Sequence, residues 1–203
     1  MDQFQLLLKR ALDLLVCLAI LVMGMPLLVL IGVLVKLTSP GSVFFIQPRV
    51  GRNGKVFQLI KFRTMTCNHQ QDAMTWTKAE DSRITPFGRF LRDYGLDELP
   101  QLINIIKDDM SIIGPRPPLP AQVEKYTKIQ HRSFRMRPGV LSLAAIKGRR
   151  GIPMEKRISL HVKYVENWSL CLDIVILWRS LCVVLGKQNA SELEENNSED
   201  LGS

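Results

Sequence analysis

The sequence predicts a mixed α/β protein held on one face of a membrane by a kinked N-terminal helix. Three observations support this class. A run of 22 residues without a charge, Leu14–Val35, has a proline at its centre. Asn53-Gly54 is a turn signal between two β-prone runs. Short amphipathic segments follow along the chain. We expect a re-entrant membrane helix over residues 1–37, a domain with a small β-hairpin and several interfacial helices over 38–188, and a disordered acidic tail over 189–203.

The apolar run is long enough to cross a bilayer, but its details favour a helix that enters and leaves on one face. Pro26, after Met25, removes a backbone hydrogen bond and kinks the helix. Each half then has about 11 residues, or roughly 16 Å of helix, which reaches about halfway through the hydrocarbon. Basic residues flank both ends, Lys9 and Arg10 before and Lys36 after, whereas a spanning helix usually carries them on one side. Met25 and Pro26 are the predicted break and Lys9 and Arg10 the predicted anchors, with a kinked spanning helix as the alternative.

The charge of the chain indicates anionic partners. The net charge is +8, although five carboxylates lie in the last 13 residues. A body this basic suits nucleic acid, anionic lipid or phosphorylated small molecules. Nucleic acid is disfavoured because few aromatic residues lie among the basic ones to stack on bases. Phospholipids and phosphorylated small molecules are therefore the expected partners.

The segment Leu96–Gln101 is the expected centre of the chemistry. Asp97 and Glu98 open an apolar-periodic run, with Pro100 close behind them. Proline is tolerated in the first turn of a helix but not in its interior, so the helix begins near Asp97 and both carboxylates lie at its positive end. That position favours an ionised carboxylate and also anion binding. A helix with ordinary acidic first-turn residues explains the hexapeptide as well.

One arginine lies on a stiff segment. Arg116 stands between Pro115 and Pro117, which fix the local backbone as extended. Its guanidinium can bind at low entropic cost and suits bidentate phosphate contact, so we expect an anion-binding role. Lys61 and Arg63 alternate on one face of the second predicted strand, and a solvated edge strand explains them as well as a phosphate site does.

An ordered set of short motifs runs between about residues 9 and 186. In order they are Lys9-Arg10 with Asp13, the run broken at Pro26, Phe44-Phe45 with Gln47–Arg49 and Gly51, Lys61–Met65, Asp81–Thr85 with Gly88 and Leu91-Arg92, Leu96–Gln101, Asp109–Ser111, Gly114–Pro117, Pro138-Gly139 and Tyr164–Ser169. Each motif is weak alone, but the ordered set is very specific. It resembles the small monotopic phosphoglycosyl transferases of bacteria, the bacterial sugar transferase family.

The resemblance implies transfer of a sugar-1-phosphate from a UDP-sugar to undecaprenyl phosphate, with release of UMP, at the cytoplasmic face of the bacterial inner membrane. The product starts a polysaccharide, O-antigen or glycoprotein glycan. The resemblance implies Mg²⁺ bound at Asp97 and a two-step route in which Asp97 attacks the β-phosphate and forms a covalent phosphosugar. Glu98 would deprotonate or orient the polyprenyl phosphate, and Arg63, Arg92 and Arg116 would hold the phosphates. A homodimer is left open.

Some positions depart from the family pattern. Leu141-Ser142 and Ala144-Ala145 stand where members often read Thr-Gly and then Gln, His161 stands where Asp is usual, and Met25 where Ser is frequent. None of these positions belongs to the carboxylate pair. The alternative function is a basic membrane-bound adaptor without catalysis, which explains the charge and the apolar run but not a carboxylate pair inside a basic surface.

Overall fold

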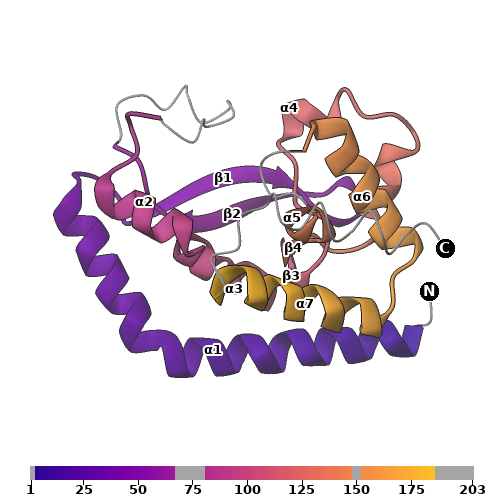
Figure 1. The fold of residues 1–203 in the computed structure, drawn as a ribbon, viewed down its shortest axis with the longest axis horizontal. Coiled ribbons are helices and arrows are strands. Elements are labelled where there is room, and N and C mark those ends of the chain that lie inside the picture. Colours follow the sequence, from indigo (N-terminus) through magenta and orange to yellow (C-terminus); the bar gives the residue numbers. More distant parts are fainter. Residues whose placement is uncertain (1–2, 67–80, 148–151, 186–203) are drawn as a thin grey trace.

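The computed structural model describes residues 3–66, 81–147 and 152–185, so the predicted tail lies outside the described residues. A long N-terminal helix forms the base, a β-hairpin lies above it, and shorter helices complete the domain (Figure 1). The predicted mixed α/β class is confirmed.

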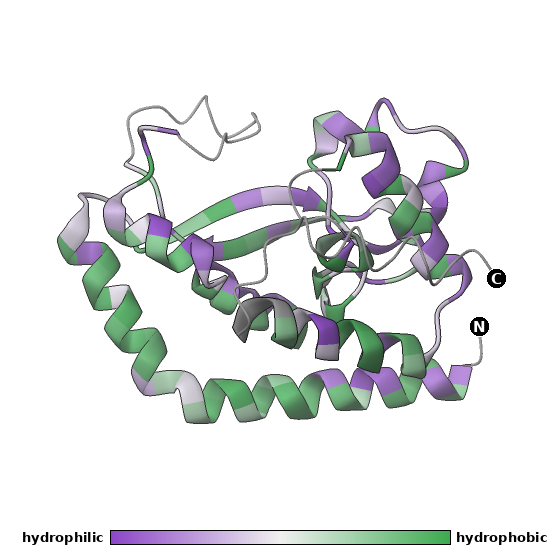
Figure 2. Ribbon diagram, viewed as in Figure 1, coloured by the Kyte–Doolittle hydropathy of each residue, from purple (hydrophilic) through white to green (hydrophobic). Residues whose placement is uncertain are grey.

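Helix α1, Gln3–Thr38, contains the charge-free run and continues through Pro26. Its length and composition are sufficient to cross a membrane, and most of its apolar side chains are exposed. Figure 1 shows the helix bent between a longer N-terminal arm and a shorter C-terminal arm, and Figure 2 shows hydrophobic residues along both. Proline inside a helix removes a hydrogen bond and clashes with the preceding turn, so we attribute the bend to Pro26.

The predicted β-hairpin is confirmed. Strands β1 (Phe44–Val50) and β2 (Val56–Phe62) pair antiparallel along their full length. The turn contains the short 3-10 helix η1 (Arg52–Gly54). Asn53 and Gly54 have φ angles of 57° and 77° there. Asn and Gly adopt this left-handed backbone more readily than other residues, which is why the dipeptide marks the turn.

The remaining elements are shorter. In chain order they are α2 (Pro86–Asp93), η3 (Leu96–Gln101), α3 (Leu102–Ile106), β3 (Ser111–Ile113), α4 (Pro120–Val123), η4 (Gln130–Arg135), β4 (Gly139–Leu141), α5 (Leu143–Ile146), α6 (Met154–Glu166) and α7 (Leu170–Leu185). Strands β3 and β4 form a separate parallel pair. Helix α7 runs beside the N-terminal arm of α1 (Figure 1).

Three clusters of buried apolar side chains lie along α1. The first packs α6 and α7 near Leu6. The second packs β2 and α3 around Cys17. The third packs α2 and η3 against Ile31 and Val35. Both arms of α1 are therefore part of one packed body.

Lys9 and Arg10, predicted as membrane anchors, point into the protein instead. Lys9 is 7% exposed, and its Nζ lies 2.7 Å from the Asp173 carboxylate and 3.0 Å from the Ile113 carbonyl oxygen. Arg10 donates to two backbone carbonyls and pairs with Asp108 at 3.0 Å. These contacts fix α1 to the domain. The prediction differed because the carboxylates that bind these cations are distant in the sequence.

Candidate active site

The carboxylate pair lies in η3, a six-residue 3-10 helix that continues directly into α3. Gly95 precedes it with φ of 68°, a conformation that favours glycine. The predicted helix start near Asp97 is confirmed to within one residue, although the first turns are 3-10 rather than α. Asp97 is only 8% exposed, whereas the Glu98 side chain is 21% exposed.

Positive side chains from three other segments surround this pair. Lys61 comes from β2, Arg92 from α2, and Arg116 from the segment after β3, and all three lower the pKa of Asp97. Arg116 Nη2 also donates to Glu98 Oε1 at 2.7 Å. The structure thus brings two of the three predicted phosphate-binding arginines to the carboxylate pair.

Arg92 reaches the site because α2 packs tightly against the chain after β2. The Thr85 hydroxyl caps α2 by accepting from the Gly88 N–H at 2.9 Å. A Cβ on Gly88 would collide with the Thr64 carbonyl, so this close approach requires glycine. Arg92 Nε then donates to Thr64 Oγ1 at 2.8 Å, which orients the guanidinium.

Arg63, the third predicted phosphate-binding arginine, lies elsewhere. Strand β2 ends at Phe62, so the alternation that would place Lys61 and Arg63 on one face stops there. Arg63 is 5% exposed, and its Nη2 donates to the carbonyl oxygens of Val35 and Ser39 at 3.3 and 2.6 Å. Its described contacts hold the C-terminal end of α1, a position that favours a cation.

Two further cations belong to the site: Lys61, which the sequence left open between a phosphate site and a solvated edge strand, and Arg49, for which it predicted no such role. Lys61 Nζ lies 5.0 Å from the centre of the Phe45 ring. Arg49 donates to the Pro117 carbonyl at 2.9 Å, and its pKa is lowered to about 10 by burial and by Arg116. The period-two pattern could have selected Lys61. Arg49 required the hairpin register, which places it on the same face four residues beyond Phe45.

The ionisation of the two central groups is shifted toward neutrality. Burial and the neighbouring Glu98 together raise the pKa of Asp97 to about 6, against the opposing effect of the nearby cations. Burial lowers the pKa of Lys61 to about 8, and Arg92 and Arg49 act in the same direction. At pH 7 Asp97 is still mostly ionised and Lys61 mostly protonated. The site therefore holds an ionised carboxylate and a cation at once.

The expected Mg²⁺ can be compared with the side chains that surround the pair. No group of three or more His, Cys, Asp or Glu residues gathers within residues 3–66, 81–147 and 152–185. Mg²⁺ is commonly bound through one or two carboxylates together with waters and substrate phosphates. Asp97 supplies such a carboxylate, and a cation there would offset the repulsion from Glu98 that raises its pKa. The residues present therefore fit Mg²⁺ bound at Asp97 with a phosphorylated substrate.

Known proteins resemble this chain along most of its length. Residues 4–187 match the family described as bacterial sugar transferase. The uncharacterized sugar transferase EpsL of Bacillus subtilis is 39% identical over 187 residues, which cover 92% of this chain and 90% of EpsL. The UDP-glucose:undecaprenyl-phosphate glucose-1-phosphate transferase of Caulobacter vibrioides is 37% identical over 190 residues, 90% of this chain and 71% of the relative. The exopolysaccharide production protein ExoY of Sinorhizobium fredii is 37% identical over 191 residues, 87% and 84% of the two chains.

Proposed function

Because the chain belongs to the bacterial sugar transferase family and is an enzyme, we propose that it transfers a sugar-1-phosphate from a UDP-sugar to undecaprenyl phosphate and releases UMP. The name of the Caulobacter vibrioides relative contains both kinds of substrate. The observation that carries the proposal is the buried Asp97 beside Glu98, surrounded by cations that suit a diphosphate.

In the first proposed step, a carboxylate oxygen of Asp97 attacks the β-phosphorus of the UDP-sugar. A carboxylate–phosphorus bond forms, and the bond from phosphorus to the bridging oxygen breaks, so that UMP leaves with that oxygen. Lys61, Arg92 and Arg116 hold the phosphates and offset the negative charge that builds up on them. Mg²⁺ at Asp97 would supply charge neutralisation and orientation of the diphosphate.

In the second proposed step, a phosphate oxygen of undecaprenyl phosphate attacks the same phosphorus and restores the free carboxylate of Asp97. Glu98 takes a proton from the incoming phosphate or orients it. Its hydrogen bond with Arg116 fixes the Glu98 carboxylate beside the reacting group. The product is a polyprenyl-diphosphate-linked sugar, the starting point of a bacterial glycoconjugate.

The proposed location is the cytoplasmic face of the inner membrane, with α1 re-entering rather than crossing. The contacts of α1 support this topology. On the N-terminal arm, Lys9 binds Asp173 and Asp13 accepts a hydrogen bond from Ser111. On the C-terminal arm, Ile31 packs in the cluster that contains α2 and η3. Both arms contact the same domain, and the exposed apolar side chains between them are left to face lipid.

The test is UMP release by the detergent-solubilised protein given Mg²⁺, undecaprenyl phosphate and a panel of UDP-sugars that includes UDP-glucose. We expect release with at least one donor, dependent on lipid and lost on chelation of Mg²⁺. Asp97→Asn should abolish release. The matched control is Asp93→Asn, an exposed carboxylate on α2, which should retain most of the activity.

The covalent step has its own measurement. A donor labelled in the sugar, supplied without lipid acceptor, should leave label on the wild-type protein and on Asp93→Asn but not on Asp97→Asn. Peptide mass spectrometry should place the phosphosugar at Asp97. Activity of Asp97→Asn above a few per cent of wild type would rule Asp97 out as the nucleophile.

A further inference from the structure

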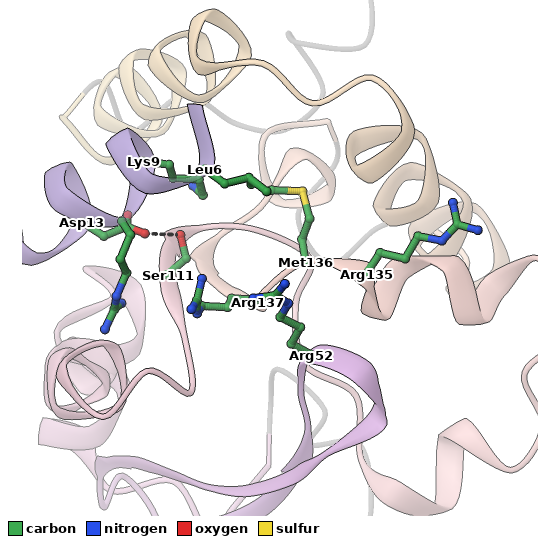
Figure 3. Close-up of a pocket in the computed structure, with 9 residues that line it drawn as sticks. Leu6, Lys9, Asp13, Arg52, Ser111, Arg135, Met136 and Arg137 are labelled. Carbon is green, nitrogen blue, oxygen red and sulfur yellow. Dashed lines mark hydrogen bonds between the residues drawn. The ribbon is translucent and has the colours of Figure 1, made fainter. Parts of the chain in front are cut away.

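A second group of cations lines a cavity near the N-terminal end of α1. The cavity has a volume of about 40 Å³ and lies between α1, the hairpin turn and the segment that follows η4 (Figure 3). Five basic side chains line it: Lys9, Arg10, Arg52, Arg135 and Arg137. The proposed transfer reaction uses none of them.

Some of these cations are already neutralised. Lys9 pairs with Asp173 at 2.7 Å. Arg10 and Arg137 share Asp108, at 3.0 and 2.7 Å. The remaining carboxylate at the cavity, Asp13, accepts from the Ser111 hydroxyl at 2.7 Å and from a backbone N–H. Five cations therefore face three carboxylates, and the excess charge is positive.

The excess charge comes with donors that have no partner. Arg137 Nε is buried and makes no hydrogen bond with any described group. The side chains of Arg52 and Arg135 take part in none of the hydrogen bonds or ion pairs within the described part of the chain. Figure 3 shows Arg52 and Arg137 meeting below Ser111, whereas the Arg135 side chain begins beside Met136 and extends away from them. Guanidinium donors gathered this way suit a tetrahedral oxyanion.

The volume and the lining residues of the cavity indicate which kind of ligand it can hold. One water needs about 10–15 Å³ on this measure, so the cavity holds roughly three water-sized groups, close to the oxygens of one phosphate. Its wall includes the apolar Leu6 and Met136. Leu7 and Leu8 follow on α1 and are 70% and 41% exposed. A phosphate that carries an apolar group could therefore extend from the cavity along α1.

The cavity is separate from the carboxylate pair. It contacts α1 no further along than Asp13, whereas η3 packs on α1 at Ile31 and Val35. The residues that line the cavity include neither carboxylate of the pair and none of the cations beside them, Lys61, Arg92 and Arg116. Within the described residues, neither Lys61 nor Arg116 makes a hydrogen bond or ion pair with a residue that lines the cavity.

We propose that this cavity is a second anion site, which binds one phosphate group and ties the hairpin turn and the segment after η4 to α1. The phosphate comes either from the headgroup of a phospholipid lying along α1 or from a soluble phosphate ester. Neither source requires the transfer reaction, so the site can be tested whether or not that reaction occurs.

The test measures binding by calorimetry to the full chain in neutral detergent. The probes are dioctanoyl phosphatidylglycerol, dioctanoylglycerol without phosphate, glycerol phosphate and inorganic phosphate. All proteins carry Arg116→Gln, to weaken phosphate binding beside the carboxylate pair. The test variant is Arg52→Gln with Arg135→Gln. The matched control, Lys125→Gln with Lys128→Gln, removes the same charge from exposed positions elsewhere.

We expect a phosphate-bearing probe to bind the Arg52/Arg135 variant at least tenfold more weakly than it binds the parent, the protein that carries Arg116→Gln alone. Its affinity for the Lys125/Lys128 control should stay within twofold of its affinity for the parent. If glycerol phosphate binds at least tenfold more weakly than phosphatidylglycerol, the ligand of the site is a lipid headgroup. If glycerol phosphate and phosphatidylglycerol bind with equal affinity, the ligand of the site is a soluble phosphate ester. The proposal is overturned if no probe binds, if dioctanoylglycerol binds as well as the phospholipid, if the Arg52/Arg135 variant binds like the parent, or if the control loses as much. Should the double variant not fold, the two single variants are each expected to lose about threefold.

Discussion

At the scale of single residues, the chemistry depends on charges held where burial disfavours them. Asp97 and Lys61 are both moved toward neutrality, the carboxylate upward and the amine downward. Each is kept charged by the other; the neighbouring arginines favour the charge of Asp97 and oppose that of Lys61. A reactive carboxylate of this kind reduces the stability of the folded protein, because the unfolded chain leaves it in water.

Asp97→Asn is therefore expected to stabilise the protein while abolishing transfer. The folded pKa of about 6 lies above the ordinary aspartate pKa of 3.8, so the wild type loses stability as pH rises from about 4 to 6. The Asp97→Asn variant has no such loss, so above pH 7 its free energy of unfolding should exceed that of the wild type by about 3 kcal/mol. Urea unfolding at pH 4 and pH 8 measures it. The same difference in free energy of unfolding at both pH values would contradict a raised pKa of Asp97 as the cause.

The pH dependence of kcat/KM should be bell-shaped. Loss of the Asp97 charge sets an acid limb at about pH 6 or below, because bound Mg²⁺ lowers the pKa of this carboxyl, and loss of the Lys61 charge sets an alkaline limb near pH 8. Lys61→Arg should move the alkaline limb upward by more than one pH unit and leave the acid limb in place. Lys55→Arg, at the exposed hairpin turn, serves as the control and should leave both limbs unchanged.

At the scale of elements, α1 is fastened by a buried polar cluster rather than by packing alone. Asp173 on α7 accepts from Lys9, from the Tyr164 hydroxyl at 2.7 Å and from Trp168 Nε1 at 3.1 Å. Every member of this cluster is buried. Full satisfaction is what makes a buried charge tolerable.

Lys9→Met should accordingly lower the free energy of unfolding by about 3–5 kcal/mol, because it leaves the buried Asp173 carboxylate without its cation. Lys36→Met, at the exposed opposite end of α1, should change it by less than about 1 kcal/mol. Thermal unfolding of both variants in the same detergent gives the comparison. Equal effects would show that the buried pair does not fasten α1.

At the scale of the whole molecule, the two arms of α1 and the domain form one body, so the chain should lie on one side of the membrane. Gln5→Cys and Asn53→Cys, both at exposed positions, probe the two sides of the apolar run. In a background without native cysteines, both should react with a membrane-impermeant maleimide only after the inner membrane is permeabilised. Reaction of one position in intact spheroplasts would indicate a spanning helix.

The sequence predicted much of the fold because the deciding signals are local. Asn53-Gly54 located the hairpin turn, Pro26 the bend in α1, and Pro100 the helix start at the carboxylate pair. Each signal acts through the backbone conformations open to one or two residues, and distant neighbours change those little.

Within the site, the sequence by itself determined the carboxylate pair and the two arginines near it, through motifs in order. Only the tertiary structure decided which other charges join them. It placed Lys61 beside Asp97, Arg49 near Glu98 and Arg116, and Arg63 at the end of α1, and it turned Lys9 into the protein. The physical reason is that a charge takes its role from its solvation and its partners, and both depend on residues far away in the chain.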